Sequence, residues 1–133
     1  MSNKITGGQA FNKFTPKALS IFNRGGIPLT ACTSEEVLQG GLYAAITHYV
    51  NECFETELNQ IKFGNNVIIF KRTEHLLGSV IIDNSDKIDP GIVEIGLNDL
   101  LKYIEKNCPE FKSEKYNSQK IENLVNQYMN NFS

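Results

Sequence analysis

Residues 58–82 read LNQIKFGNNVIIFKRTEHLLGSVII, and this stretch decides the fold. It divides into three apolar runs, LNQIKF, VIIFKR and LLGSVII, separated by polar turns at 64–66 and 73–75. Runs rich in Ile, Val and Phe between Gly, Asn and charged residues are typical of β-strands. The runs at 67–70 and 76–82 are nearly continuous in apolar residues, which indicates strands covered on both faces. Helices are therefore predicted on both sides of the sheet.

Two helical patterns follow the strands. Asp89 and Pro90 predict an N-cap and a first-turn proline for a helix that runs to about Asn107 and ends before Pro109. Its apolar residues lie on or near one side: Ile92, Val93, Ile95, Leu100, Leu101 and Ile104. A second helix is predicted from about 118 to 131, with Ile121, Leu124, Val125, Tyr128 and Phe132 at helical spacing.

A longer helix is predicted before the strands. Thr33 and Glu36 have the spacing of a capping box, and the helical pattern after them runs to about Phe54. Its predicted buried face consists of Leu38, Leu42, Ala45, Ile46, Tyr49 and Cys53. Because glycine weakens a helix, Gly40 and Gly41 indicate that this helix closely approaches a neighbouring backbone.

The segment before this helix has the pattern of a hairpin. ALSIF (18–22) and IPLTAC (27–32) are two short apolar runs on either side of the turn residues 23–26. Pro28 cannot donate a hydrogen bond, so the second run is predicted to be an edge strand.

The chain has 133 residues, which indicates one domain at 17–133 preceded by a flexible N-terminal arm at 1–16. Residues 1–17 carry Lys4, Lys13 and Lys17 and no acid, so the rest of the chain holds 10 basic against 15 acidic residues. We interpret the arm as a solvated tail. A weak contact with its own acidic surface or with an anionic lipid remains an alternative.

The net charge of −2 argues against a nucleic-acid partner. Cys32, Cys53 and Cys108 are odd in number and widely spaced, which predicts free thiols in a reducing compartment. Cys53 is placed on the buried helix face, and Cys108 is expected to be partly exposed. With no secretory signal and no apolar run long enough for a membrane span, we expect a cytoplasmic protein.

The residue types that carry chemistry are present but badly spaced. His48 and Cys53 point about 140° apart on one helix, so they cannot share a metal ion. His75 lies in a predicted turn, the acids are scattered, and neither Gly-Gly pair has the spacing of a phosphate-binding loop. We therefore expect no enzyme, no catalytic residue, no metal and no cofactor.

The element order resembles that of longin domains, within the longin and roadblock group. The resemblance rests on ALSIFNRGGIPL, EEVLQGGLYAAITHYV and FGNNVIIFKRTEHLLGSVII. It implies an α/β (α+β) fold of three αβα layers, with element order β-β-α-β-β-β-α-α. The sheet would have five antiparallel strands, with one helix on one face and two helices on the other. It also implies a non-catalytic adaptor in small-GTPase regulation or membrane trafficking.

A second apolar stripe on the long helix is the predicted partner site. It consists of Tyr43, Thr47, Val50 and Phe54, and Ile61 and Phe63 on the next strand extend it. Similar domains associate through this helix and strand, which implies a dimer with itself or a related chain, on a surface also available to a small GTPase. Two alternatives are that the arm or a loop covers the stripe, and that the domain is a small-molecule sensor with a pocket between sheet and helices.

Overall fold

The structure is a computed structural model, and it describes residues 16–30, 34–85, 88–108 and 118–131. The elements are β1 (Ala18–Asn23), α2 (Ser34–Phe54), β2 (Gln60–Phe63), β3 (Asn66–Arg72), β4 (Leu76–Asp83), α3 (Pro90–Asn107) and α4 (Ser118–Asn131). The three strands predicted between 58 and 82 and the helices predicted after residue 88 are confirmed. The predicted arm at 1–16 lies outside the described residues except for residue 16, and so do Thr33, Cys32, Pro109 and Phe132.

The described residues form an α+β fold whose sheet has four strands in the order β1-β4-β3-β2. Each neighbouring pair is antiparallel, with Ser20 opposite Ser79 and Ile69 opposite Val80. The predicted five-stranded sheet and the order β-β-α-β-β-β-α-α are therefore wrong, because the run at 27–32 does not form a strand in its described part.

The turn after β1 explains why the described residues contain no fifth strand. The side-chain oxygen Oδ1 of Asn23 accepts hydrogen bonds from the N–H groups of Gly25 and Ile27, at 2.9 and 3.0 Å. The chain then reverses, but it meets β1 only through a bridge between Phe22 and Pro28 and a hydrogen bond from the Leu29 N–H to the Ile21 carbonyl. Because Pro28 has no N–H group, it cannot extend a ladder.

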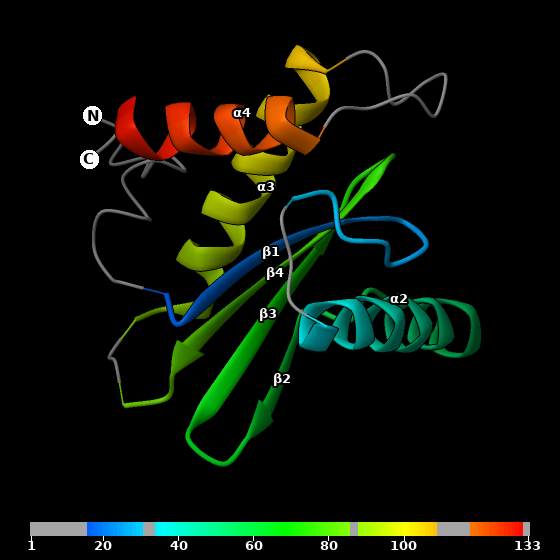
Figure 1. The fold of residues 1–133 in the computed structure, drawn as a ribbon. Coiled ribbons are helices and arrows are strands. Elements are labelled where there is room, and N and C mark those ends of the chain that lie inside the picture. Colours follow the sequence, from blue (N-terminus) through cyan, green and yellow to red (C-terminus); the bar gives the residue numbers. More distant parts are fainter. Residues whose placement is uncertain (1–15, 31–33, 86–87, 109–117, 132–133) are drawn as a thin grey trace, which may run out of the picture.

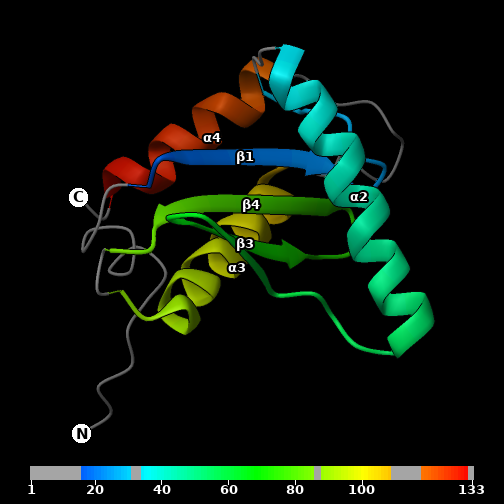
Figure 2. The same cartoon turned by 90° about the horizontal axis from the view of Figure 1, so that it is seen from below.

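Helices α3 and α4 cover one face of the sheet (Figures 1 and 2). The Asp89 carboxylate caps α3 by accepting the Gly91 N–H at 2.9 Å, as predicted. The core between these helices and the sheet includes Ile21, Ile69 and Val80 from the strands. The helices contribute buried side chains along their whole length: Val93, Leu97, Leu100, Leu101, Ile104, Ile121, Leu124 and Tyr128. Among the residues predicted for this side of α3, Ile95 is instead exposed.

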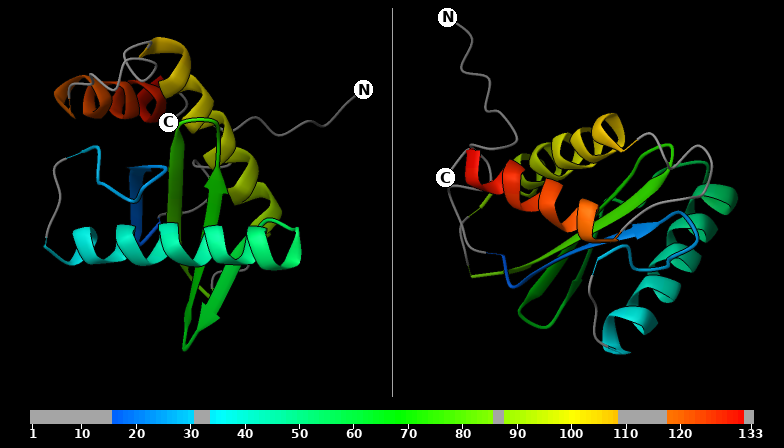
Figure 3. Two further views of the ribbon diagram at one scale, coloured as in Figure 1. Left: turned by 90° about the vertical axis from the view of Figure 1, so that its right-hand side faces the viewer. Right: turned by 45° about the horizontal axis from the view of Figure 1, so that its top comes forward.

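Among the described residues, only helix α2 covers the opposite face, and it runs across the strands rather than along them (Figures 2 and 3). The core here is smaller: Phe22, Ile68, Phe70 and Leu77 from the sheet meet Tyr43 from the helix. The Tyr43 ring contacts the rings of Phe22 and Phe70 edge to face, with centroids 6.1 and 5.0 Å apart. The expectation that both faces of the sheet are covered is thus confirmed for β3 and β4.

Two glycines let α2 reach this face. A Cβ atom on Gly40 would overlap the carbonyl oxygen of Gly26 and lie 2.6 Å from the Phe22 ring, and a Cβ atom on Gly26 would overlap the Gly40 carbonyl. Gly26 also has a φ of +89°, which favours glycine. The predicted close backbone approach is confirmed for Gly40, whereas Gly41 has no atom within 4 Å of such a Cβ.

None of the helices in the described residues is long and apolar enough to cross a membrane.

Candidate functional site

The predicted partner stripe on α2 is largely the inner side of that helix. Tyr43 and Thr47 are buried against the sheet, and Val50 is half-buried. The Thr47 hydroxyl donates to the Tyr43 carbonyl at 2.7 Å, and burial raises the pKa of Tyr43. The prediction that Tyr43 and Thr47 form an exposed partner surface is therefore wrong, because both side chains belong to the core beneath α2.

Two arginines lie near the turn between β3 and β4, and one of them, Arg72, contacts α2. The Arg72 guanidinium donates to the Thr47 carbonyl at 3.2 Å, and the Arg24 guanidinium donates to the Thr73 carbonyl at 2.8 Å. Partial burial lowers the pKa of Arg24, and the nearby positive charge of Arg72 lowers it further. The Arg72 contact joins the end of β3 to the side of α2 that faces the sheet.

The other predicted site residues are more accessible. Phe54 is 64% exposed at the end of α2, and Phe63 is 49% exposed on β2, an edge strand of the sheet. Ile61 is half-buried and packs against the small core beneath α2. The structure thus separates Phe54 and Phe63 from Tyr43 and Thr47, with which they were grouped.

The side of α2 that was predicted to be buried faces outward. We call Leu38, Leu42, Ala45, Tyr49 and Cys53 the outer face of α2; all five are exposed, Leu38 by 76%, Leu42 by 63% and Tyr49 by 58%. The predicted buried face is therefore wrong for these five residues, whereas Ile46, its sixth member, is half-buried. Tyr49 also contacts Phe54, with ring centroids 6.2 Å apart, so the outer face ends in a pair of exposed aromatic rings.

The sequence contained only part of the signal for the correct orientation of α2. Gly40, Tyr43 and Thr47 are spaced three and four residues apart, so they share one side of a helix. Gly40 and Gly41 were both predicted to approach another backbone, but they lie about 100° apart on the helix, so the glycines alone did not identify the side that packs. The apolar pattern also did not identify the buried side, because α2 has apolar residues on both sides.

The outer face of α2 has acidic ends. Glu35 and Glu52 lie at opposite ends of α2 and both are exposed. Residues 34–54 contain no lysine and no arginine in the sequence. The surface is therefore a strip of apolar side chains with negative charge at each end.

One polar cluster lies away from α2's outer face. Glu74, His75 and Glu105 bring one ligand atom each to within 4.8 Å of one another. The His75 Nε2 atom is 3.7 Å from a Glu74 oxygen, and the His75 backbone N–H donates to Glu105 at 3.2 Å. Such a set matches the ligands of a divalent cation, but Glu74 extends into solvent. The sequence could not reveal this cluster, because Glu105 comes from α3.

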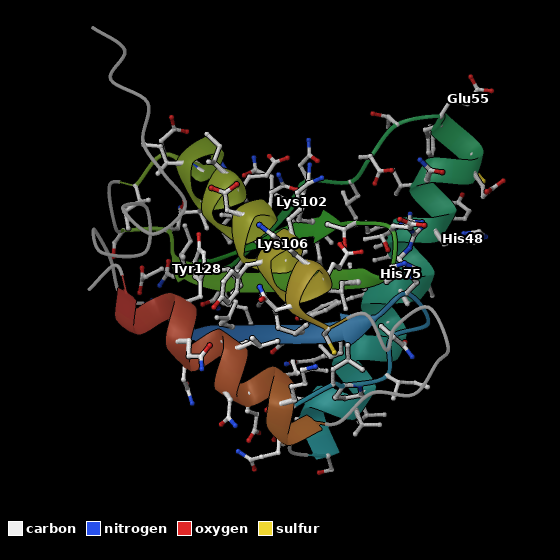
Figure 4. All side chains as sticks on the ribbon, turned by 90° about the horizontal axis from the view of Figure 1, so that it is seen from above. His48, Glu55, His75, Lys102, Lys106 and Tyr128 are labelled. Carbon is white, nitrogen blue, oxygen red and sulfur yellow. The ribbon has the colours of Figure 1, made fainter. Side chains whose placement is uncertain are left out.

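A cleft of about 630 Å³ adjoins this cluster, between the β3–β4 turn and α3. Lys71 and Glu94 form an ion pair at 3.5 Å beside it. Figure 4 shows His75 at the turn and Lys102 on α3, the helix that forms the other wall. The lining is mostly charged, unlike the mostly apolar pockets that bind small organic ligands.

Neither of the two described cysteines forms a disulfide, as predicted, but their positions are the reverse of the prediction. Cys53 is exposed on the outer face of α2, and Cys108 is buried at the end of α3. The error at Cys53 has the same cause as the error in the helix orientation.

Comparison of the chain with models of known protein families gives no match. Comparison with curated proteins gives no match either.

Proposed function

We propose that this chain is a non-catalytic adaptor domain that binds another protein through the outer face of α2. The observation that carries the proposal is the exposure of Leu38, Leu42 and Tyr49 in one strip along a helix whose other side is packed. Contiguous exposed apolar surface with aromatic members is typical of protein interfaces.

The free energy of burial supports this role for the strip. Complete burial of a leucine side chain stabilises a complex by about 1.5–3 kcal/mol, so Leu38 and Leu42 alone represent a substantial gain on binding. Exposed Tyr49 and Phe54 add the residue types that carry binding energy at interfaces.

The pathway of this proposal is taken from the sequence resemblance to longin domains, although the described residues do not form the five-stranded sheet that the resemblance implied. We place the chain in small-GTPase regulation or membrane trafficking, with a small GTPase and a related adaptor chain as partners.

Affinity purification from native extract tests the proposal. The full chain is immobilised and incubated with extract that contains either a non-hydrolysable GTP analogue or GDP. We expect a small GTPase, identified by mass, in one nucleotide state with the wild type, and its loss with Leu42→Glu. Because Leu42 is exposed, this variant should unfold at nearly the wild-type temperature.

Ile95→Glu is the matched control, because Ile95 is an exposed apolar residue on α3. It should retain the GTPase. Retention by Leu42→Glu as well, or loss from both variants, would contradict a role for the outer face of α2.

A further inference from the structure

We propose that the outer face of α2 takes an amphipathic helix of another protein whose apolar stripe is flanked by lysines or arginines, and not a second copy of this chain. This inference rests on the proposed function, since it names the chemistry of the partner at the same surface.

The spacing of the exposed residues selects a helix as the occupant. Leu38, Leu42, Ala45 and Tyr49 are separated by four, three and four residues, which is the spacing of the seam between paired helices. Gly41 and Ala45 are small and exposed near the middle of the seam, and a Cβ on Gly41 would meet nothing within 4 Å. A partner helix can therefore approach the backbone of α2 closely at this point.

The charges at the two ends of the outer face of α2 indicate which charge a partner should carry. Glu35 and Glu36 lie in the first turn of α2, where acids interact favourably with the helix dipole. Glu52 lies in the last turn, where the dipole disfavours an acid, and α2 has no basic residue in that turn. Helix stability therefore does not explain Glu52, whereas a lysine or arginine of a partner would pair with it.

The same charges disfavour a second copy. In an antiparallel pair of α2 helices that sets Leu38 against Tyr49 and Leu42 against Ala45, Glu35 lies opposite Glu52, and two-fold symmetry repeats the clash. In a parallel pair, each glutamate lies opposite itself. Juxtaposed like charges across an interface suppress a pairing, so both arrangements are opposed.

Two synthetic helical peptides of equal length test the sign of the charge. Both carry leucines at the spacing of the α2 seam; one has lysines at the flanking positions and the other has glutamates. We expect the full chain to bind the lysine peptide at least about tenfold more tightly at low salt, with a smaller difference at high salt. The chain alone should sediment as a monomer.

A charge-swap variant gives the sharpest result. Glu35→Lys combined with Glu52→Lys should reverse the preference, so that the glutamate peptide binds more tightly. Glu74→Lys, at an exposed acid outside α2, is the matched control and should leave the preference unchanged. Leu42→Glu should weaken both peptides.

The remaining outcomes overturn the inference. Self-association of the wild type that Leu42→Glu abolishes would identify a second copy as the occupant. The N-terminal arm contains two aromatic residues, Phe11 and Phe14. A full chain with Phe11→Ser and Phe14→Ser that binds the lysine peptide about tenfold more tightly than wild type would identify the N-terminal arm as the occupant. A third outcome is that Leu42→Glu loses GTPase capture while the wild type binds the two peptides equally. This result would support the proposed function and contradict the inference that the partner is positively charged.

Discussion

The two faces of the sheet are covered by helices of different character. On one face, α3 and α4 each bury a single apolar side in a shared core that includes Leu97, Leu100 and Ile121. On the other face, α2 buries Tyr43 and Thr47 and leaves Leu38 and Leu42 in solvent.

This difference shows when an apolar pattern identifies the buried side of a helix. In α3 the apolar residues occupy mainly one side, so the side predicted to be buried is the buried side, apart from Ile95. In α2 they occupy two sides, and burial of either would satisfy the pattern. Close packing determines which side of α2 is buried. Because Gly40 has no side chain, the helix can lie against Gly26 and Phe22. The Tyr43 ring packs between the rings of Phe22 and Phe70.

The largest expected effect compares one leucine from each face. Leu100→Ala removes a fully buried side chain from the α3 side and should lower the free energy of unfolding by about 2–5 kcal/mol. Leu42→Ala on the outer face of α2 should change it by less than about 0.5 kcal/mol. Urea unfolding of both variants measures the difference. Equal losses would mean that the outer face of α2 is packed.

The reactivity of one cysteine on each side of the sheet tests the same difference without a substitution at either position. In a Cys32→Ser chain, Cys53 should react with a thiol reagent at least about a hundredfold faster than Cys108, because the buried thiol reacts only when the end of α3 opens. The rates are measured by mass spectrometry of quenched samples. A faster reaction at Cys108 would contradict its burial.

Adjacent glycines provide the third comparison. Gly40→Ala should lower the free energy of unfolding by about 1–3 kcal/mol, because the new Cβ would overlap the Gly26 carbonyl and the Phe22 ring. Gly41→Ala should raise it by about 0.5–1 kcal/mol, since alanine favours the helix and the added atom meets nothing. Thermal unfolding of both variants tests this. A stabilising Gly40→Ala would show that α2 does not lie against the turn.

The smallest expected effect is a decrease in the free energy of unfolding at alkaline pH, caused by Tyr128 on α4. Burial, with a smaller contribution from nearby Asp99, raises the pKa of Tyr128 to about 12. The unfolded chain, with a tyrosine pKa of about 10, loses this proton first, so the stabilisation is complete below about pH 10 and is lost as the pH rises toward 12.

Tyr128→Phe should therefore flatten the decline in unfolding free energy above about pH 10, as measured by urea unfolding at a series of pH values. Tyr43→Phe is the comparison on the other face, where burial also raises the tyrosine pKa. An unchanged slope in Tyr128→Phe would contradict the burial of that hydroxyl.

The sequence by itself determined the elements that local rules specify. The apolar runs between 58 and 82 predicted β2, β3 and β4, and Asp89 with Pro90 predicted the start of α3, because strand patterns and helix caps depend on neighbours along the chain. It also placed Phe54 and Phe63 among the candidate contact residues, and both are exposed.

Only the tertiary structure decided the rest. Whether the run at 27–32 joined the sheet depended on the ladder that Pro28 could form with β1, and the cluster of Glu74, His75 and Glu105 depended on where α3 packs. The outer face of α2 became a surface because a two-sided apolar helix can bury only one side against a single sheet. Packing at Gly40 and Tyr43 chose that side, and the apolar period of the helix is the same for either choice.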